Sequence, residues 1–309
     1  MNQSTNQNAQ RVTTEDLRKT VHGLAEAIAN GQSDQAFDQY LTWISRLHRY
    51  CWGNIGLMTT EWKHRQEADP GLPPLSHVAS YRTWNKLGRQ VRRGEKGIAI
   101  LVPIELSGKT LLDDETSEEK HLRPRTVFRV GHVFSVSQTD GDQTPNWKQD
   151  LGTDAAKLLP TLTEIAKEHG IEVEFAPLGA ENGNSKGGKI TINSLRPQGV
   201  QAQTMIHELA HELLEHAKTN RNATEPPGRA VIEGEAEAVT VVVMRALGHD
   251  TASNGAAYIR SHGGDAKTIT ASLERIAKTA KTILEDIEDA SGDHHEDAEP
   301  AAAPALTAA

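Results

Sequence analysis

The segment TMIHELAHELLEH, residues 204–216, limits the folds open to this chain more than any other stretch. Two of its histidines, His207 and His211, are four residues apart, so on a helix they lie about 40° apart and share one face. The opposite side of that helix is apolar and carries Ile206, Leu209, Ala210, Leu213 and Leu214. We therefore expect a helix whose apolar side packs on a core and whose histidines face a polar space.

A His-Glu-x-x-His helix is typical of zinc sites that hydrolyse peptide bonds. The two histidines bind the metal, zinc keeps a position open for water and lowers its pKa to around 7, and Glu208 is the general base. An ordinary polar helix face is the alternative, because the motif is short. The apolar side of the helix and the β-strand predicted before it favour the metal site.

His216 follows the motif at a spacing that does not fit a ligand. In the long zinc signature the third histidine comes ten residues after the first, past a glycine that ends the helix. His216 comes nine residues after His207 without a glycine between them. Nine residues on a continuing helix turn through about 900°, which is half a turn away. We therefore expect His216 at the surface, facing away from the site.

A second candidate for the site is RAVIEGEAEAVTVVV, which places three glutamates in an otherwise apolar helix. A helix that packs in a core does not carry carboxylates without partners, and a metal is such a partner. Glu233 and Glu237 share one face, whereas Glu235 points about 200° away from Glu233. One face can thus supply a ligand and a carboxylate that orients a histidine through its other ring nitrogen. A solvated acidic patch is the alternative.

The two halves of the 309-residue chain differ in charge and in aromatic content. Residues 1–150 hold 19 Lys and Arg against 18 Asp and Glu, and residues 151–309 hold 14 against 24. Of the 13 aromatic residues, 11 lie before residue 150. This asymmetry predicts two domains, over residues 13–145 and 151–290, between disordered tails at 1–12 and 291–309.

Residue periodicity predicts an α+β fold: an N-terminal helix-plus-sheet module, then a C-terminal domain that combines helices with short strands. The predicted helices are 13–31, 33–50, 53–66, 154–170, 201–218, 230–248 and 265–290, and the predicted strands are 97–106, 126–136, 171–178 and 189–193. Residues 179–188 are expected to form a loop or hairpin tip. A polar N-terminus, a single cysteine and no run of about 20 apolar residues favour a cytoplasmic protein without a membrane segment.

The region from Val78 to Ile104 is basic and aromatic in an otherwise acidic chain. It carries one acid, Glu95, and six cations interleaved with Tyr81 and Trp84. Single-stranded nucleic acids are bound by such mixtures, because cations follow the phosphates and aromatic faces stack on bases. A solvated basic hairpin with Trp84 in the core is the alternative.

HELAH followed by EGEAEA resembles the Glu-type zinc metallopeptidases, in particular the ImmA/IrrE-like group. The resemblance implies a zincin-like C-terminal domain in which Glu233, the first residue of Glu-x-x-Ala, is the third zinc ligand. It also implies that Glu237 is the carboxylate beside a histidine ligand. The chain reads VTVVV where the group often has a Phe-Ala stretch.

YCWGNIGLM, then SYRTWNKLGRQVRRGEKGIAILVP, then VFSVSQTDG resemble, in this order, the N-terminal domain of ArdC-type antirestriction proteins. That domain binds single-stranded DNA, is joined to a zinc metallopeptidase domain, and is found on plasmids and other mobile elements. The resemblance implies DNA contacts by Arg82, Trp84, Lys86, Arg89, Arg92, Arg93 and Lys96. Asn54, Gln138 and Thr139 match family positions without a chemistry that their residue types explain.

These features predict a zinc metallopeptidase-like protein that binds single-stranded DNA, acts on an unidentified protein or peptide, and protects incoming DNA from restriction. One alternative is a DNA-binding protein without proteolysis, in which zinc is structural. Another is a regulatory protease that cleaves a DNA-bound repressor. Tyr258 is a possible oxyanion donor near the zinc, with plain packing as its alternative.

Overall fold

The computed structural model describes residues 34–106, 110–112, 119–121, 125–142, 155–216, 227–249, 251 and 266–291, together with the single positions 13, 15, 19 and 26. Its first half contains α2 (Asp34–Leu47), α3 (Trp52–Ala68), β1 (Val78–Ala79), α4 (Tyr81–Lys86), β2 (Arg89–Val91), β3 (Ile98–Leu106), β4 (Thr110–Leu112), β5 (Glu119–His121), β6 (Arg125–Ser135) and β7 (Thr139–Gly141). Its second half contains α5 (Leu159–Glu168), β8 (Glu172–Ala176), β9 (Gly183–Ser185), β10 (Lys189–Asn193), α6 (Gln198–Leu213), α8 (Arg229–Ala246) and α10 (Ala266–Ala290).

The N-terminal sheet is antiparallel, in the order β1-β6-β3, and α3 packs against β3. The β3–β6 pair is long, with partners from Ile98↔Val133 to Leu106↔Arg125. Asn54 joins α3 to this sheet, because its buried amide donates to the Leu101 carbonyl and accepts from the Leu101 N–H, both at 2.9 Å. A structural hydrogen-bond pair therefore explains a position that the sequence left without a role.

The C-terminal sheet has the order β8-β10-β9, with β8 parallel and β9 antiparallel to β10. β9 lies inside the segment that we expected to be a loop or hairpin tip. It passes close over α6, since a Cβ atom added to Gly183 would come within 2.6 Å of Thr204 Cγ2 and 3.3 Å of Glu208 Cγ. The close approach that glycine permits brings an edge of the sheet onto the histidine helix.

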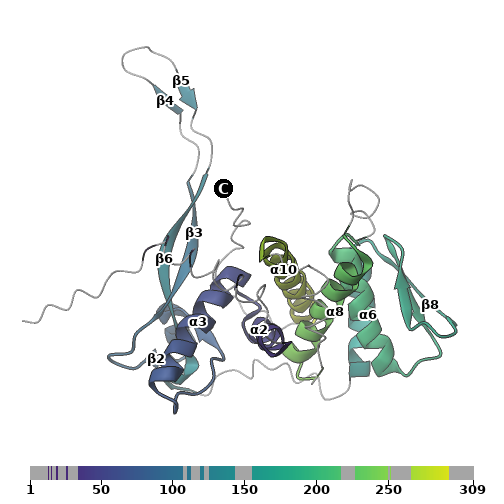
Figure 1. The fold of residues 1–309 in the computed structure, drawn as a ribbon, viewed down its shortest axis with the longest axis horizontal. Coiled ribbons are helices and arrows are strands. Elements are labelled where there is room, and N and C mark those ends of the chain that lie inside the picture. The colour runs from purple at the N-terminus through teal and green to yellow at the C-terminus, as the bar shows by residue number, and fades with distance from the viewer. Residues whose placement is uncertain are drawn as a thin grey trace, which may run out of the picture.

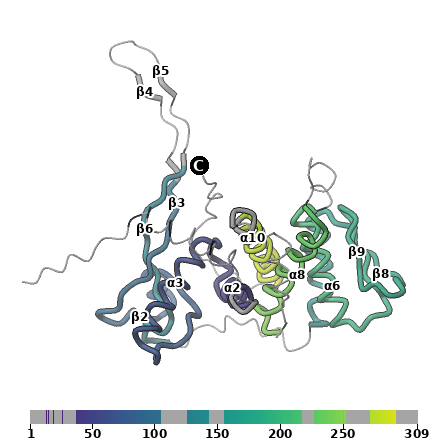
Figure 2. Tube along the Cα trace, in the orientation of Figure 1, coloured from purple at the N-terminus to yellow at the C-terminus, as the bar shows by residue number. Residues whose placement is uncertain are grey.

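Helices α3, α2, α10, α8 and α6 lie between the two sheets (Figure 1), and one continuous apolar core runs through them. Helix α2 of the first half packs on α8 of the second, where Arg245 donates to Asp38 at 2.7 Å and to Thr42 at 2.9 Å. Figure 2 traces the same arrangement along the chain. The predicted two-domain α+β fold is confirmed, whereas the exact domain boundaries stay a prediction.

Three further local features differ from what the sequence indicated. Residues 81–86 form helix α4, which the sequence did not indicate, and the predicted helix 154–170 divides into a 3₁₀ turn over Ala155–Leu158 and α5, whose first turn holds Pro160. The histidine helix ends at Leu213 instead of residue 218. No helix among the described residues is both long and apolar enough to cross a membrane. The tails, most of helix 13–31 and Tyr258 lie outside the described residues.

Candidate metal centre and nucleic-acid interface

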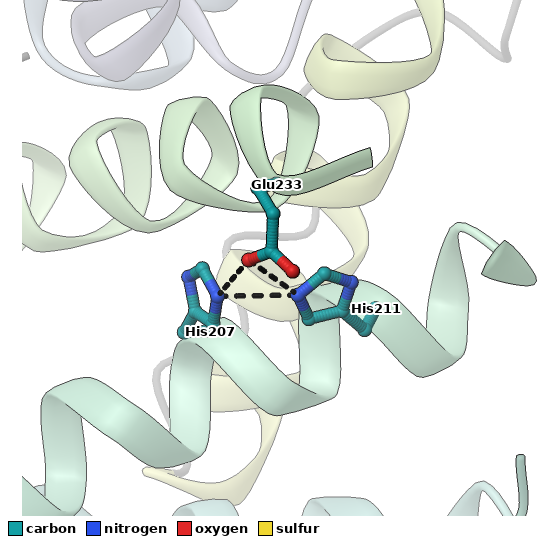
Figure 3. Close-up of side chains that lie close together, drawn as sticks. All are labelled: His207, His211 and Glu233. Atoms are coloured by element: carbon teal, nitrogen blue, oxygen red, sulfur yellow. Dashed lines mark hydrogen bonds and ion pairs between the residues drawn. The ribbon is translucent and has the colours of Figure 1, made fainter. Parts of the chain in front are cut away.

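Helices α6 and α8 cross so that His207, His211 and Glu233 point toward one another (Figure 3). The two Nε2 atoms of the histidines are 3.1 Å apart. Glu233 Oε2 lies 3.5 Å from His207 Nε2 and 3.6 Å from His211 Nε2. Among the described residues this is the one group of His, Cys, Asp or Glu side chains close enough to hold a metal ion.

The spacing of these three atoms fits a zinc ion. Zinc bound tetrahedrally through bonds of about 2.0–2.1 Å holds neighbouring ligand atoms about 3.3 Å apart. Two imidazole nitrogens and one carboxylate oxygen are also a donor set that zinc prefers at catalytic sites. The structure thus places the three residues where the sequence predicted ligands, and their binding of a metal stays a prediction.

A cavity of about 730 Å³ opens beside these residues and is lined by α6, α8 and β9. Glu208 lines the same cavity and is 7 % exposed. Burial, followed by the negative charges of Glu233, Glu212 and Glu181, raises the pKa of its carboxyl group to about 7. A carboxyl group with a pKa near neutrality, inside a cavity, is suited to take up and release protons.

The two histidines differ in their surroundings. Burial, followed by the charges of His207 and His216, lowers the pKa of His211 to about 4, so its imidazole is neutral and has a lone pair to offer. His207 Nδ1 lies 3.7 Å from Glu237 Oε2. Glu237 is thus beside a histidine as predicted, at a distance that leaves its orienting role a proposal.

The prediction that His216 faces away at the surface is wrong. His216 is 3 % exposed, and its Nδ1 lies 2.9 Å from His211 Nδ1. The phase argument assumed a continuing helix, but α6 ends at Leu213 and Glu215 adopts a left-handed φ of 56°. Because of this turn, the His216 ring contacts the ring of His211.

The spacing on the helix predicted that Glu235 points away from Glu233. In the structure Glu235 is 2 % exposed and faces α10. It accepts from His216 Nε2 at 2.9 Å and from Ser272 Oγ at 2.6 Å, and Arg275 lies 3.1 Å away. Burial alone would raise the pKa of Glu235, but these hydrogen bonds and the charge of Arg275 lower it. Glu235 is therefore a partnered carboxylate and not part of a solvated patch.

Because the carboxyl group of Glu208 is buried, we expect the free energy of unfolding of the metal-free protein to depend on pH. Its pKa is about 7 in the folded chain against an ordinary 4.5. Between these values the folded state binds more protons than the unfolded state, so the free energy of unfolding falls as pH rises. Glu208→Gln removes this loss and should be more stable than the parent by about 1–3 kcal/mol above pH 7.

The check is urea unfolding of both proteins in chelator at pH values from 4.5 to 8.5. The difference should grow between pH 4.5 and 7 and then stay level. His211 titrates with the opposite sign, but it is present in both proteins and cancels in the comparison. A difference that is the same at every pH would show that Glu208 is not a buried proton-binding group.

Two family models match the chain in tandem. Residues 7–134 match the N-terminal domain of anti-restriction factor ArdC. Residues 166–252 match the peptidase family M78 model, described as the IrrE N-terminal-like domain, and include all three candidate ligands. The chain is an ArdC-type protein. The resemblance predicted from the motifs is thereby confirmed, and the protein joins an antirestriction-family N-terminal domain to a metallopeptidase-like one.

Two solved structures are also similar to this ArdC-type protein. The metal-free crystal structure of the antirestriction ArdC protein from the R388 plasmid is 21% identical, with a TM-score of 0.44, over 77% of this chain and 85% of that one. The Mn(II)-bound structure is 19% identical, with a TM-score of 0.47, over 88% and 97%. The comparison with curated proteins finds no match.

In the ArdC-type domain the basic segment forms α4, β2 and the turn into β3. Ser80 begins α4 by accepting a hydrogen bond from the Thr83 N–H. Trp84 is fully buried with Ala79 and Val91, and its Nε1 donates to the Phe134 carbonyl at 2.9 Å. The prediction that Trp84 contacts DNA is therefore wrong, because its ring faces are covered by protein.

Arg89 and Arg92 hold the fold around this small core. Arg89 donates to Thr139 Oγ1 at 2.8 Å and to the Thr139 carbonyl at 3.0 Å, which joins β2 to β7. Arg92 pairs with Glu95 at 2.7 Å and donates to the Ser137 carbonyl at 2.6 Å. Gln138 is 3 % exposed and donates to Glu95 at 3.0 Å. Internal partners therefore occupy these polar groups, including Gln138 and Thr139, whose role the sequence did not explain.

The remaining cations of the segment, Arg82, Lys86, Arg93 and Lys96, are exposed. Arg82, Arg93 and Lys96 have no ion-pair partner among the described residues. Tyr81, 46 % exposed, packs its ring edge-on against Phe134 with centroids 6.4 Å apart. The exposed aromatic ring of this surface is thus that of Tyr81 and not that of Trp84, which the sequence predicted as a DNA contact.

Proposed function

We propose that this ArdC-type protein is a zinc metallopeptidase that binds single-stranded DNA and protects incoming DNA of a mobile element from restriction. The observation that supports it best is the convergence of His207 Nε2, His211 Nε2 and Glu233 Oε2 beside a cavity that Glu208 also lines. Structural zinc sites are closed by four protein ligands, whereas catalytic ones use three and keep a position open. Three ligands facing a cavity favour the catalytic form.

The residues of this chain divide the reaction between them. His207, His211 and Glu233 would hold the zinc ion, which when bound supplies a Lewis acid and an open position for water. Glu208 takes the proton from a water molecule in the cavity as that water attacks the peptide carbonyl carbon, and then donates it to the leaving amine nitrogen. Glu237 orients His207, and Tyr258 is proposed as the oxyanion donor.

The cavity also has features suited to an extended peptide. β9 is one of the two edge strands of its sheet, and Asn184 lies on it. Asn184 lines the cavity, and an edge strand beside a cavity can accept an extended peptide through its backbone. The edge strand at the cavity supports a protein or peptide substrate.

DNA binding is proposed for the surface formed by Tyr81, Arg82, Lys86, Arg93 and Lys96, with Arg89 and Arg92 as supports. Cations there follow phosphates and the Tyr81 ring stacks on a base. Figure 1 places β2, which lies in the sequence between Lys86 and Arg93 of this surface, at the far side of the helices from α6. DNA and peptide would thus be bound at separate places on one chain.

Two measurements on the parent protein test the proposal. Elemental analysis after loading and desalting should give about one zinc per chain, and His207→Ala should lose it. Gel shifts at low and moderate salt should show preference for single-stranded over double-stranded oligonucleotides, with binding weakened strongly by salt. Zinc retained in His207→Ala would contradict the metal site, and equal or no binding of both DNA forms would contradict the DNA surface.

A further inference from the structure

His211 is joined to a buried hydrogen-bond relay that runs through His216 to Glu235, which packs against α10. The relay passes from His211 Nδ1 to His216 Nδ1 over 2.9 Å, and from His216 Nε2 to Glu235 Oε2 over 2.9 Å. Both His216 and Glu235 are 3 % exposed or less, so water does not compete for these bonds. Among the described residues His207, the other proposed histidine ligand, has no such relay, since its Nδ1 atom lies 3.7 Å from the half-exposed Glu237.

The direction of the relay follows from its far end. Glu235 accepts from Ser272 Oγ at 2.6 Å and lies 3.1 Å from the Arg275 guanidinium, so it is an ionised carboxylate and only accepts. His216 Nε2 must therefore carry the proton of their bond. In the neutral form of His216 one ring nitrogen donates and the other accepts, so His216 Nδ1 is then the acceptor.

The same rule then fixes the neighbouring ring. Because His216 Nδ1 accepts, His211 Nδ1 is the donor, and the lone pair of His211 lies on Nε2. That nitrogen faces His207 Nε2 at 3.1 Å and Glu233 Oε2 at 3.6 Å. The opposite direction would set the His216 Nε2 lone pair against an ionised carboxylate at 2.9 Å, which is repulsive.

We propose that His216 and Glu235 are positioning residues that fix the tautomer and orientation of His211, so that its Nε2 lone pair is aimed at the metal. This inference rests on the metal site proposed above. Ser272 and Arg275 on α10 hold Glu235 in place, so the relay anchors one ligand to the core of the protein. Partners of this kind around a metal typically change affinity by about 10- to 100-fold when removed.

The first test measures zinc affinity by competition with a chromophoric chelator. His216→Phe keeps a ring of similar size without its nitrogens, and Glu235→Gln keeps the shape of the side chain without its charge. Both should bind zinc about 10- to 100-fold more weakly than the parent. The matched control is His169→Phe, which removes a histidine 2.8 Å from the Asp286 carboxylate, outside the relay. It should bind zinc like the parent.

If the parent binds zinc and His216→Phe binds it equally well, the relay proposal is overturned while the metal site stands. If neither the parent nor His207→Ala binds zinc, the metal site is wrong. The hydrogen-bond direction of the relay is then tested separately by the tautomer of His211. A purely structural pair would lower stability in His216→Phe without changing the tautomer of His211.

The second test reads that tautomer in the metal-free parent protein, so it depends neither on zinc nor on the stability of the His216 and Glu235 variants. Histidine is labelled with ¹⁵N, long-range ¹H–¹⁵N correlation spectra are recorded at about pH 7.5, and the His211 signals are assigned by their loss in His211→Gln. The relay requires a proton on His211 Nδ1 and none on Nε2. A proton found on Nε2 would overturn the proposal.

Discussion

Glu208→Gln should lower peptide hydrolysis about 100- to 10,000-fold, the usual contribution of general acid–base catalysis. The amide cannot take a proton from water, but it has almost the same shape as the protonated carboxyl group that a pKa of about 7 keeps populated. Glu208 is not one of the three converging donors, so zinc content should stay at the parent level. The measurement is hydrolysis of a mixture of fluorogenic peptides, with zinc content determined on the same samples.

The same variant distinguishes between a proteolytic and a non-proteolytic mechanism of antirestriction. Parent and variant can each be produced in a restricting host and scored for the transformation efficiency of an unmodified plasmid. If hydrolysis protects DNA, Glu208→Gln loses protection together with hydrolysis. If the variant protects as well as the parent, proteolysis is not the antirestriction mechanism, and the non-proteolytic alternative holds. A loss of zinc in the variant would contradict the assignment of Glu208 as a base.

Neutralising four exposed cations of the basic segment by Arg82→Gln, Lys86→Gln, Arg93→Gln and Lys96→Gln together should nearly abolish binding to single-stranded DNA at moderate salt. Each phosphate contact to a single strand contributes about 0.7 to the slope of log affinity against log salt, so the slope should fall by up to about 3. The control replaces four exposed lysines of the C-terminal half, Lys157, Lys167, Lys186 and Lys278, with the same change of net charge. The control should bind like the parent, and equal losses would indicate unspecific charge attraction.

Tyr81→Ala adds a test that does not depend on charge. Base stacking on an aromatic ring contributes about 1–3 kcal/mol, so the variant should bind single strands about 5- to 150-fold more weakly. Tyr81→Phe keeps the ring and should bind like the parent. An unchanged affinity in Tyr81→Ala would remove this ring from the DNA surface.

Local helix geometry was predictable from the sequence, because it depends only on residue spacing. The spacing placed His207 and His211 on one face and set Glu235 opposite Glu233, and the structure has these relations. The α+β class and the two-domain family architecture followed from periodicity and motif order. These two predictions were correct because each depends on a pattern that extends over many residues.

The parts that were missed depend on contacts between distant segments or on a single backbone angle. His216 is buried because Glu215 turns left-handed after α6, which no spacing rule shows. Glu235 did offer a signal, since a carboxylate in an apolar helix needs a partner, and His216 is that partner. Trp84 is covered by β1, β2 and β6, which are brought together only in the fold.

The central claim is that His207, His211 and Glu233 hold one zinc ion. The most direct measurement is the anomalous difference density of crystals of this protein soaked in zinc. We predict one strong peak about 2.0–2.2 Å from His207 Nε2, His211 Nε2 and an oxygen of Glu233. A map without a peak there, or a peak bound by Glu235 or Glu237 in place of Glu233, would contradict the account.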